Sequence, residues 1–426
     1  MSRLNTFVPP RPNRVVMTAM TCINRLLVVG GLPGLKHLRP RPLTRITEVN
    51  FPVADQAKLR ALVRAEDTAV FITPNHPEFF TDWMLDKYLL SLVAPRAASW
   101  ATHTIVNGMG RVAQWFWLAN NLIAQIPRVA ETAKFHSVKV AARGDGVLLH
   151  PEGSVGWHSN YIGPVFPGAV DMALRVQEYH PEVLASYIAP VVWKLVFTSD
   201  VTEGLLAEYR YICSQLKIVA QVELTPAQAV YHLYEELLAR DEAVVQILAS
   251  RNNSVFERLP QYLTEATAEL AELVFSTETG TALLRVAREW QQSNQNADRG
   301  KARTVQLLLS GIVRWQKFFT IARRSNLMTQ EELAEHQKRL RAELCTSGIR
   351  NTLNKFIPIA VGPRRACIRV LEPFLMPELA VLQSPAERAA IVDDLTLALR
   401  IRLQSGLDDL NVELNGCFIT YPNPFL

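Results

Sequence analysis

Residues 69–82, AVFITPNHPEFFTD, decide the fold predicted for this chain. The first five, Ala69 to Thr73, are apolar or β-branched, which predicts a short buried strand. Hydrophobic residues recur at helical spacing from Glu78 to Val93, so a helix is expected to follow the strand. His76 therefore lies in the turn between a strand end and a helix start. In α/β proteins such turns commonly hold reactive groups, because the scaffold is rigid and the turn is open to a ligand.

The flanking sequence alternates in the same way. Strands are predicted at residues 46–51, 99–106, 147–149 and 185–192, and helices at residues 55–65, 115–118, 130–143 and 168–174. This alternation predicts an α/β fold in which a mixed sheet is flanked by helices.

The second half of the chain predicts a large additional helical region. Residues 200–352 have mostly helical periodicity, with an amphipathic helix at 227–248 and a polar loop at 291–303. Residues 303–324 combine an apolar, aromatic face with arginine and lysine edges. Such a helix either lies at a membrane interface or buries its apolar face on a partner helix.

Strand-like runs return at residues 356–361 and 367–371, and an amphipathic helix is predicted at 385–410. We expect the sheet to resume there, which makes the helical region an insertion. In the alternative, residues 216–222 close the sheet and the tail is a separate element. Four regions are therefore predicted. Residues 1–47 form a basic amphipathic arm for membrane association, and residues 48–225 form the α/β core. Residues 226–350 form a helical insertion or second helical domain, and residues 351–426 form the closing strands and a C-terminal helix.

Composition indicates a globular protein in a reducing compartment. The chain has 426 residues, of which 49% are hydrophobic and 20% charged, so it can bury a large core. Its five cysteines are an odd, scattered set without a Cys-x-x-Cys pair, so we expect buried free thiols and neither disulfides nor a zinc site.

Positive charge is concentrated at the start of the chain. Residues 1–47 contain no Asp or Glu, and their basic residues are Arg3, Arg11, Arg14, Arg25, Lys36, Arg39, Arg41 and Arg45. The apolar stretch 15–35 among them is interrupted by Asn24 and Arg25 and is too broken to cross a bilayer. We therefore expect a cytoplasmic protein in peripheral contact with anionic membrane lipid, and no nucleic-acid partner. A transit peptide is the alternative explanation of the basic start.

Four motifs follow one another between residues 70 and 195. They are Asn75-His76 with Asp82, the apolar run Leu122–Arg128, the turn Pro151-Glu152-Gly153-Ser154 after a strand, and the strand 185–192 with its internal Pro190. In this order they resemble the signatures of the glycerophospholipid acyltransferase family, of the lysophosphatidic acid acyltransferase type. The resemblance implies an α/β acyltransferase core.

The resemblance also implies an activity. A fatty acyl group would move from a thioester, acyl-CoA or acyl carrier protein, to a hydroxyl of a lysolipid or glycerol-phosphate acceptor, without a metal or other cofactor. His76 would be the general base and Asp82 would orient it. Arg128 would bind the acceptor's phosphate, Glu152 would hold the acceptor's hydroxyls or order neighbouring loops, and Pro190 would lie in the strand that lines the acyl site. Asn75, Gly153 and Ser154 complete the expected substrate-binding set.

Two departures from the family pattern leave other functions open. Five residues separate His76 from Asp82 where the family has four, and Val155 stands where the family has arginine. The first departure favours a catalytically inactive relative that binds lipid or a partner, and the second favours an acceptor without a phosphate. A serine hydrolase is disfavoured because no Gly-x-Ser-x-Gly occurs in the chain.

Overall fold

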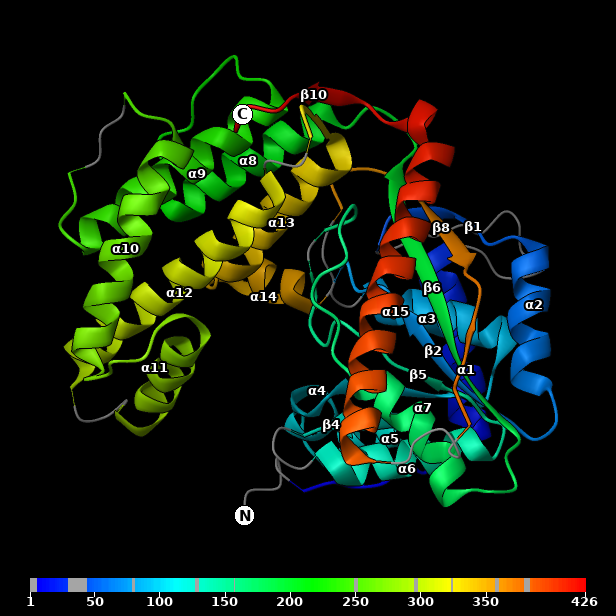
Figure 1. Cartoon of the computed structure of the whole chain (residues 1–426). Helices are drawn as coiled ribbons and strands as arrows, with labels where there is room; N and C mark the ends of the chain where they lie inside the picture. Colours follow the sequence, from blue (N-terminus) through cyan, green and yellow to red (C-terminus); the bar gives the residue numbers. More distant parts are fainter. Residues whose placement is uncertain are drawn as a thin grey trace. The chain divides into compact units, whose positions relative to one another are not determined.

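The computed structural model divides the chain into two compact units (Figure 1). The first, called here the sheet unit, comprises residues 1–201 and 341–418, and the second, the helical unit, comprises residues 202–340 and 419–426. The structure describes residues 6–29, 44–78, 81–126, 130–156, 158–248, 252–294, 298–322, 325–356, 360–378 and 384–426.

The sheet unit is built on a mixed sheet of eight strands with the order β1-β8-β6-β2-β5-β3-β4, and β9 pairs with β6 beside this path. Strands β6, β2, β5, β3 and β4 are parallel, whereas β8 and β9 run antiparallel to β6. The strands are β1 (Ile46–Asn50), β2 (Thr68–Pro74), β3 (Ala98–Thr102), β4 (Leu122–Gln125), β5 (Val147–Leu148), β6 (Ala185–Phe197), β8 (Arg364–Val370) and β9 (Phe374–Leu375). This confirms the predicted α/β class and mixed sheet.

Helices cover both faces of this sheet. Helices α6 (Ala130–Ala142), α7 (Gly168–Tyr179) and α15 (Pro385–Glu413) pack on one face, and Figure 1 shows α15 lying along β6. On the other face pack α2 (Val53–Arg64) and α3 (Thr81–Val93). The remaining helices of the unit are α1 (Arg14–Val29), α4 (His103–Gly108), α5 (Arg111–Ala119) and α14 (Ile349–Phe356).

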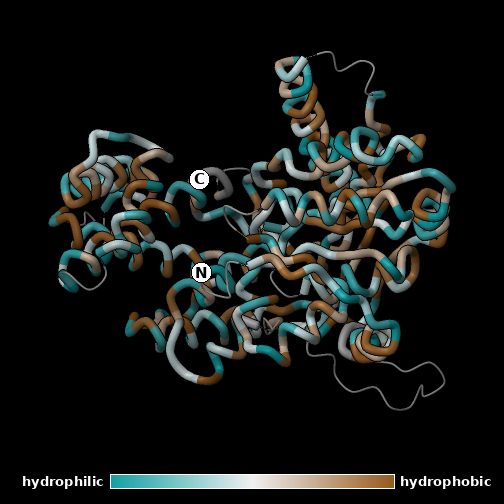
Figure 2. Tube along the Cα trace, turned by 90° about the horizontal axis from the view of Figure 1, so that it is seen from below, coloured by the Kyte–Doolittle hydropathy of each residue, from teal (hydrophilic) through white to brown (hydrophobic). Residues whose placement is uncertain are grey.

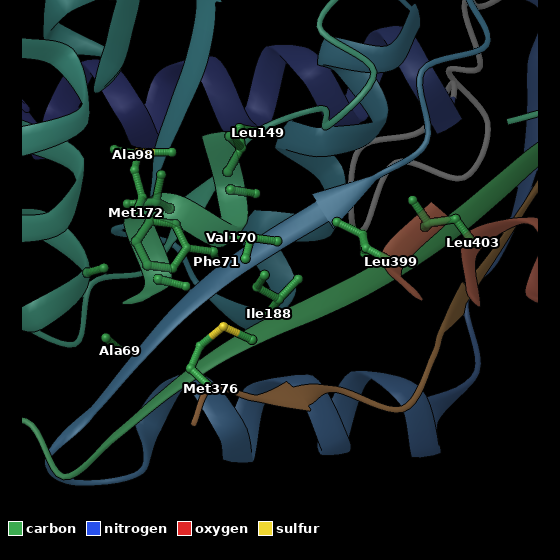
Figure 3. Close-up of a cluster of buried hydrophobic side chains, with 14 of the residues drawn as sticks. Ala69, Phe71, Ala98, Leu149, Val170, Met172, Ile188, Met376, Leu399 and Leu403 are labelled. Carbon is green, nitrogen blue, oxygen red and sulfur yellow. The ribbon is translucent and has the colours of Figure 1, made fainter. Parts of the chain in front are cut away.

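The run that predicted the first buried strand explains this sandwich. Side chains alternate across a strand, so Phe71 faces the core under α7 while Val70 and Ile72 face the core under α3. Figure 3 shows Phe71, Val170 and Ile188 gathered between β2, β6 and α7. A strand buried on both faces needs a continuous apolar sequence, which is what residues 69–73 supply.

Residues beyond the helical unit rejoin the sheet. Strand β8 lies between β1 and β6, pairing parallel with β1 and antiparallel with β6. The alternative in which residues 216–222 close the sheet is wrong, because the described chain forms no strand there. The predicted strand 356–361 also differs: Phe356 ends α14, residues 357–359 lie outside the described chain, and Ala360 and Val361 belong to no strand.

The helical unit begins at Thr202, earlier than the predicted boundary of 226, and residues 419–426 belong to it. Its elements are α8 (Thr202–Leu216), α9 (Pro226–Val244), α10 (Val255–Leu273), α11 (Gly280–Asn294), α12 (Arg299–Ala322), α13 (Gln330–Leu344), whose last turn passes the unit boundary, and the antiparallel pair β7 (Leu327–Thr329) and β10 (Thr420–Pro422). Tyr234, Phe318 and Phe425 form an aromatic cluster in its core.

The apolar face of helix α12 is buried within the protein. Leu308, Ile312 and Trp315 are buried, so this face packs inside the helical unit and not on a membrane. Hydrophobic and hydrophilic residues are interspersed along the traced chain (Figure 2). Among the described residues, no helix has the length and apolarity needed to cross a bilayer.

Three local predictions differ from the structure. The predicted strand 99–106 ends at Thr102, where α4 begins. The predicted loop 291–303 is mostly the end of α11 and the start of α12. Cys22 and Cys417 are exposed, whereas the other cysteines are buried as expected. Within the basic arm, helix α1 packs against α3, and Asn24 Nδ2 donates a hydrogen bond to the carbonyl of Met84 at 2.7 Å.

Candidate active site

The candidate site lies at the carboxyl ends of two neighbouring parallel strands. Strand β2 ends at Pro74 and β5 at Leu148, and His76 and His150 each follow two residues later. Ile72 pairs with Leu148, so the strand register brings the two histidines together. Their rings are stacked, with centroids 4.0 Å apart and planes at 18°. Open α/β sheets bind ligands at such carboxyl ends.

His76 and Asp82 form a hydrogen-bonded pair. Nδ1 of His76 contacts Oδ2 of Asp82, and the backbone N–H of Glu78 donates to Oδ1 of Asp82 at 3.0 Å. The side chain of His76 is 18% exposed and that of Asp82 only 2%. Helix α3 begins at Thr81, so the additional residue lies ahead of the helix, in a segment whose residues 79–80 are outside the described chain. The five-residue spacing is therefore compatible with a touching pair.

Glu152 fixes the backbone around His76. Its Oε1 accepts the backbone N–H of His76 and its Oε2 accepts that of Gly163, both at 2.8 Å. The carbonyl of His76 in turn accepts the N–H of Gly156 at 2.8 Å. Of the two expected roles of Glu152, the structure supports the ordering of loops, because both carboxylate oxygens are already bonded to backbone.

Asn75 has a similar structural role. Its side chain exchanges two hydrogen bonds with the backbone of Trp193 in β6: Nδ2 donates to the carbonyl at 3.1 Å and Oδ1 accepts the N–H at 2.8 Å. The side chain is buried. The expected direct contact of Asn75 with substrate is therefore replaced by a bond that anchors the turn carrying His76.

A cavity of about 640 Å³ opens beside the histidines, in the size range of small-molecule sites. Its polar wall comprises His76, Asp82, Asp86, Lys134 and His150. Its apolar and aromatic wall includes Trp83, Trp100, Ile105, Trp117, Leu122, Leu149, Phe166 and Met172.

Only some of the other predicted binding residues line the cavity. Gly153 and Ser154 line the cavity, as does Val155. Pro190 is buried in β6 and is not among the residues that line this cavity, so its contact with an acyl chain stays a prediction. Arg128 lies outside the described residues.

The sequence prediction missed His150 and Asp86. Nε2 of His150 is 2.9 Å from Oδ2 of Asp86, and its Nδ1 is 3.0 Å from the carbonyl oxygen of Asn75. Two signals were available. His150 directly precedes the Pro-Glu-Gly turn, and Asp86 lies four residues after Asp82 on one helix, a spacing that places both carboxylates on the same face.

Burial and neighbouring charges set the acid–base properties of the site. The pKa of His76 is held well below its ordinary value, first by burial and then by the charge of His150. Burial, followed by the carboxylates of Asp86 and Glu78, raises the pKa of Asp82 well above its ordinary value. For His150, burial acts to lower the pKa, but the charge and hydrogen bond of Asp86 outweigh it and raise the pKa. The pKa values of the two histidines are therefore shifted in opposite directions, down for His76 and up for His150.

The side chains of His76, Asp82 and His150 bring potential metal-ligand atoms within 4.8 Å of one another. The geometry does not fit a metal centre. An imidazole lone pair lies in the ring plane, so two stacked, nearly parallel rings direct their lone pairs side by side and not to one point. Both nitrogens of His150 also face other oxygen atoms.

Comparisons with known proteins add no family. The chain matches no protein-family model, and the comparison with curated proteins finds no significant match.

Proposed function

We propose that this protein is an acyltransferase that moves a fatty acyl group from a thioester donor to a hydroxyl of a lysophospholipid or glycerol-phosphate-type acceptor. The observation that carries the proposal is the His76–Asp82 pair on the wall of a largely apolar cavity. A histidine paired with a carboxylate is the arrangement of a general base, and an apolar wall suits an acyl chain.

We assign the proton transfer to the Nε2 atom of His76. Nδ1 is bonded to Asp82, and within the described chain Nε2 has no hydrogen-bond partner. Nε2 would accept the proton of the acceptor hydroxyl as its oxygen attacks the thioester carbonyl. When the tetrahedral intermediate collapses, the carbon–sulfur bond breaks and the imidazolium returns the proton to the thiolate. Asp82 would stabilise the imidazolium between these steps.

Three backbone amides next to His76 and the start of α3 are not free to stabilise an oxyanion. The described amides near the start of α3 are already used: His76 N–H by Glu152, Glu78 N–H by the side chain of Asp82, and Asp82 N–H by the carbonyl of Glu78. These amides therefore hold the dyad in place, which is preorganisation of the base.

The sheet order and motif order are also consistent with a glycerolipid acyltransferase-like core, which we include in the proposal. We further propose peripheral contact with membrane lipid through α1. In this helix Val15 and Ile23 are exposed, and its first residue is Arg14. Lysolipid acceptors and long-chain thioesters partition to such surfaces.

The decisive experiment measures thiol release from palmitoyl-CoA with and without lysophosphatidic acid in mixed vesicles. We expect release that depends on the acceptor. His76→Ala and Asp82→Asn should each lower kcat by roughly 10²–10⁴-fold, because they remove the base or its partner. His180→Phe, which removes another carboxylate-paired histidine outside the cavity, is the matched control and should keep full activity.

Two other results would reject the proposal. Release that needs no acceptor would identify a thioesterase. No release with acyl-CoA or acyl carrier protein donors, from folded protein that still binds vesicles, would favour a lipid-binding protein.

A second acceptor class is favoured by one observation. Val155, in place of the family's arginine, lines the cavity and supplies no positive charge there. A lysolipid without a phosphate is therefore the second candidate acceptor. Parallel assays with monoacylglycerol and lysophosphatidic acid distinguish the two, and faster turnover of monoacylglycerol would establish the second.

A further inference from the structure

The second histidine of the site has contacts that the general-base mechanism does not use. The side chain of His150 is 11% exposed and contacts the end of β2 and helix α3, and its ring is stacked on that of His76, with centroids 4.0 Å apart. A structural histidine needs hydrogen bonds but has no need to stack on the catalytic ring. The contacts of its two nitrogens show which charge state the site favours.

Both nitrogens of His150 face hydrogen-bond acceptors. Nδ1 is 3.0 Å from the carbonyl oxygen of Asn75 and 3.2 Å from that of Pro74, and a carbonyl only accepts. Nε2 is 2.9 Å from the carboxylate of Asp86. A neutral imidazole has one N–H and satisfies one of these two sides, whereas the imidazolium satisfies both.

We propose that His150 is a positioning residue that, as an imidazolium stacked on His76 and neutralised by Asp86, keeps His76 in the neutral form able to accept a proton. This inference rests on the proposed function for its catalytic meaning. It adds a second dyad, His150–Asp86, beside the first on the cavity wall. A positive charge against the face of His76 disfavours a second positive charge there, so His76 remains unprotonated at lower pH than an ordinary histidine.

The other charged groups around His150 are consistent with this role. Asp82 and Asp86 face it from α3, and Glu152 lies in its own loop with both oxygens bonded to backbone amides. Lys134 lines the same cavity from α6 but is paired with Asp171 at 3.0 Å. Asp86 is therefore the carboxylate hydrogen-bonded to His150, and its removal should alter the charge of His150 directly.

The test uses histidine-ring NMR and the pH profile of the full chain. The chain has nine histidines, so signals of ring-¹³C-labelled protein can be assigned by single substitutions. In the native protein we expect His150 to be protonated and His76 neutral at pH 7. In His150→Phe, which keeps an aromatic ring on His76, the titration of His76 should move up by roughly one pH unit. The acidic limb of kcat/KM should move up equally, while the rate above pH 8 changes by only a few-fold.

Two further variants guard against misfolding. His150→Phe leaves Asp86 buried without its partner, so the double variant His150→Phe with Asp86→Asn removes both charges and should show the same upward direction. Asp86→Asn alone should lower the titration of His150. His180→Phe is the control and should change neither titration.

Several results would overturn the inference. A neutral His150 at pH 7, an unchanged His76 titration in both His150 variants, or a lower rate with an unmoved acidic limb would each show that His150 is only structural. The NMR titrations need no turnover. If they behave as expected but no acceptor is acylated, the proposed function fails while the charge assignment stands.

Discussion

Gly153 lines the cavity in a left-handed backbone conformation that leaves no space for a side chain. Its φ is +65°, and a Cβ placed there would lie 2.9 Å from the ring of Phe166, on the cavity wall. Gly144 has a similar φ of +72° but has no atom within 4 Å of such a Cβ. An alanine substitution at Gly144 therefore adds backbone strain alone, whereas one at Gly153 adds both backbone strain and a steric clash.

We expect Gly153→Ala to lower the free energy of unfolding by about 2 kcal/mol and Gly144→Ala by about 1 kcal/mol, since only the first adds a clash to the strain. Urea denaturation of both variants measures the difference. Equal losses would show that Phe166 moves aside without cost.

The residues of the site differ in how far the sequence alone could predict their contacts. His76 and Asp82 were predictable because their spacing is local, and the pair is in contact. His150 and Asp86 were not predicted because their meeting depends on β5 pairing with β2, a contact between strands about 75 residues apart. For Asn75 and Glu152 the residues were predicted but their partners were not, because sequence alone does not show that Asn75 bonds to the backbone of Trp193 or that Glu152 accepts the N–H groups of His76 and Gly163.

At the scale of elements, a buried ion pair joins the start of α3 to β8. Oε2 of Glu78 accepts from Nη1 of Arg364 at 2.7 Å, and both side chains are buried. Arg364 also donates to the carbonyl of Thr44, just before β1. The pair therefore ties the loop that carries the candidate base to a strand nearly 290 residues later.

Glu78→Gln should lower the free energy of unfolding by about 3 kcal/mol, because it leaves the buried guanidinium of Arg364 without its counter-charge. Glu372→Gln breaks an exposed pair with Lys58 and should leave the urea midpoint unchanged. A midpoint that is equally unaffected by both substitutions would mean that Arg364 finds another partner.

The elements were predictable to different degrees for a physical reason. Strand β2 and helices α6, α9 and α15 follow their own hydrophobic periodicity, so the prediction placed them within a few residues. The apolar run at 356–361 has strand composition, yet Phe356 ends a helix and Ala360 and Val361 belong to no strand, so local composition alone does not determine the element. The order of the strands, with β8 between β1 and β6, depends on long-range pairing that no local pattern encodes.

At the scale of the whole molecule, each unit has its own core, and the candidate cavity lies in the sheet unit alone. We therefore expect two thermal transitions. Palmitoyl-CoA at about 100 times its Kd should stabilise the unit that binds it by about 2.7 kcal/mol and raise that transition by several degrees.

Differential scanning calorimetry, with hydrogen exchange to assign each transition, makes this measurement. Coenzyme A without an acyl chain is the control and should raise the transition less. A ligand shift confined to the helical unit would place the binding site elsewhere.

The position of β8 has a consequence for the synthesis of the chain on the ribosome. Strands β1 and β6 leave the ribosome early, but the strand that pairs with both spans Arg364–Val370 and is made more than 160 residues after β6. Until then an edge of β6 has no partner, and open strand edges promote aggregation. The time needed to synthesise the helical residues separates β6 from its partner strand β8. During that time a chaperone that shields strand edges should protect the nascent chain from aggregation and raise the yield of folded protein.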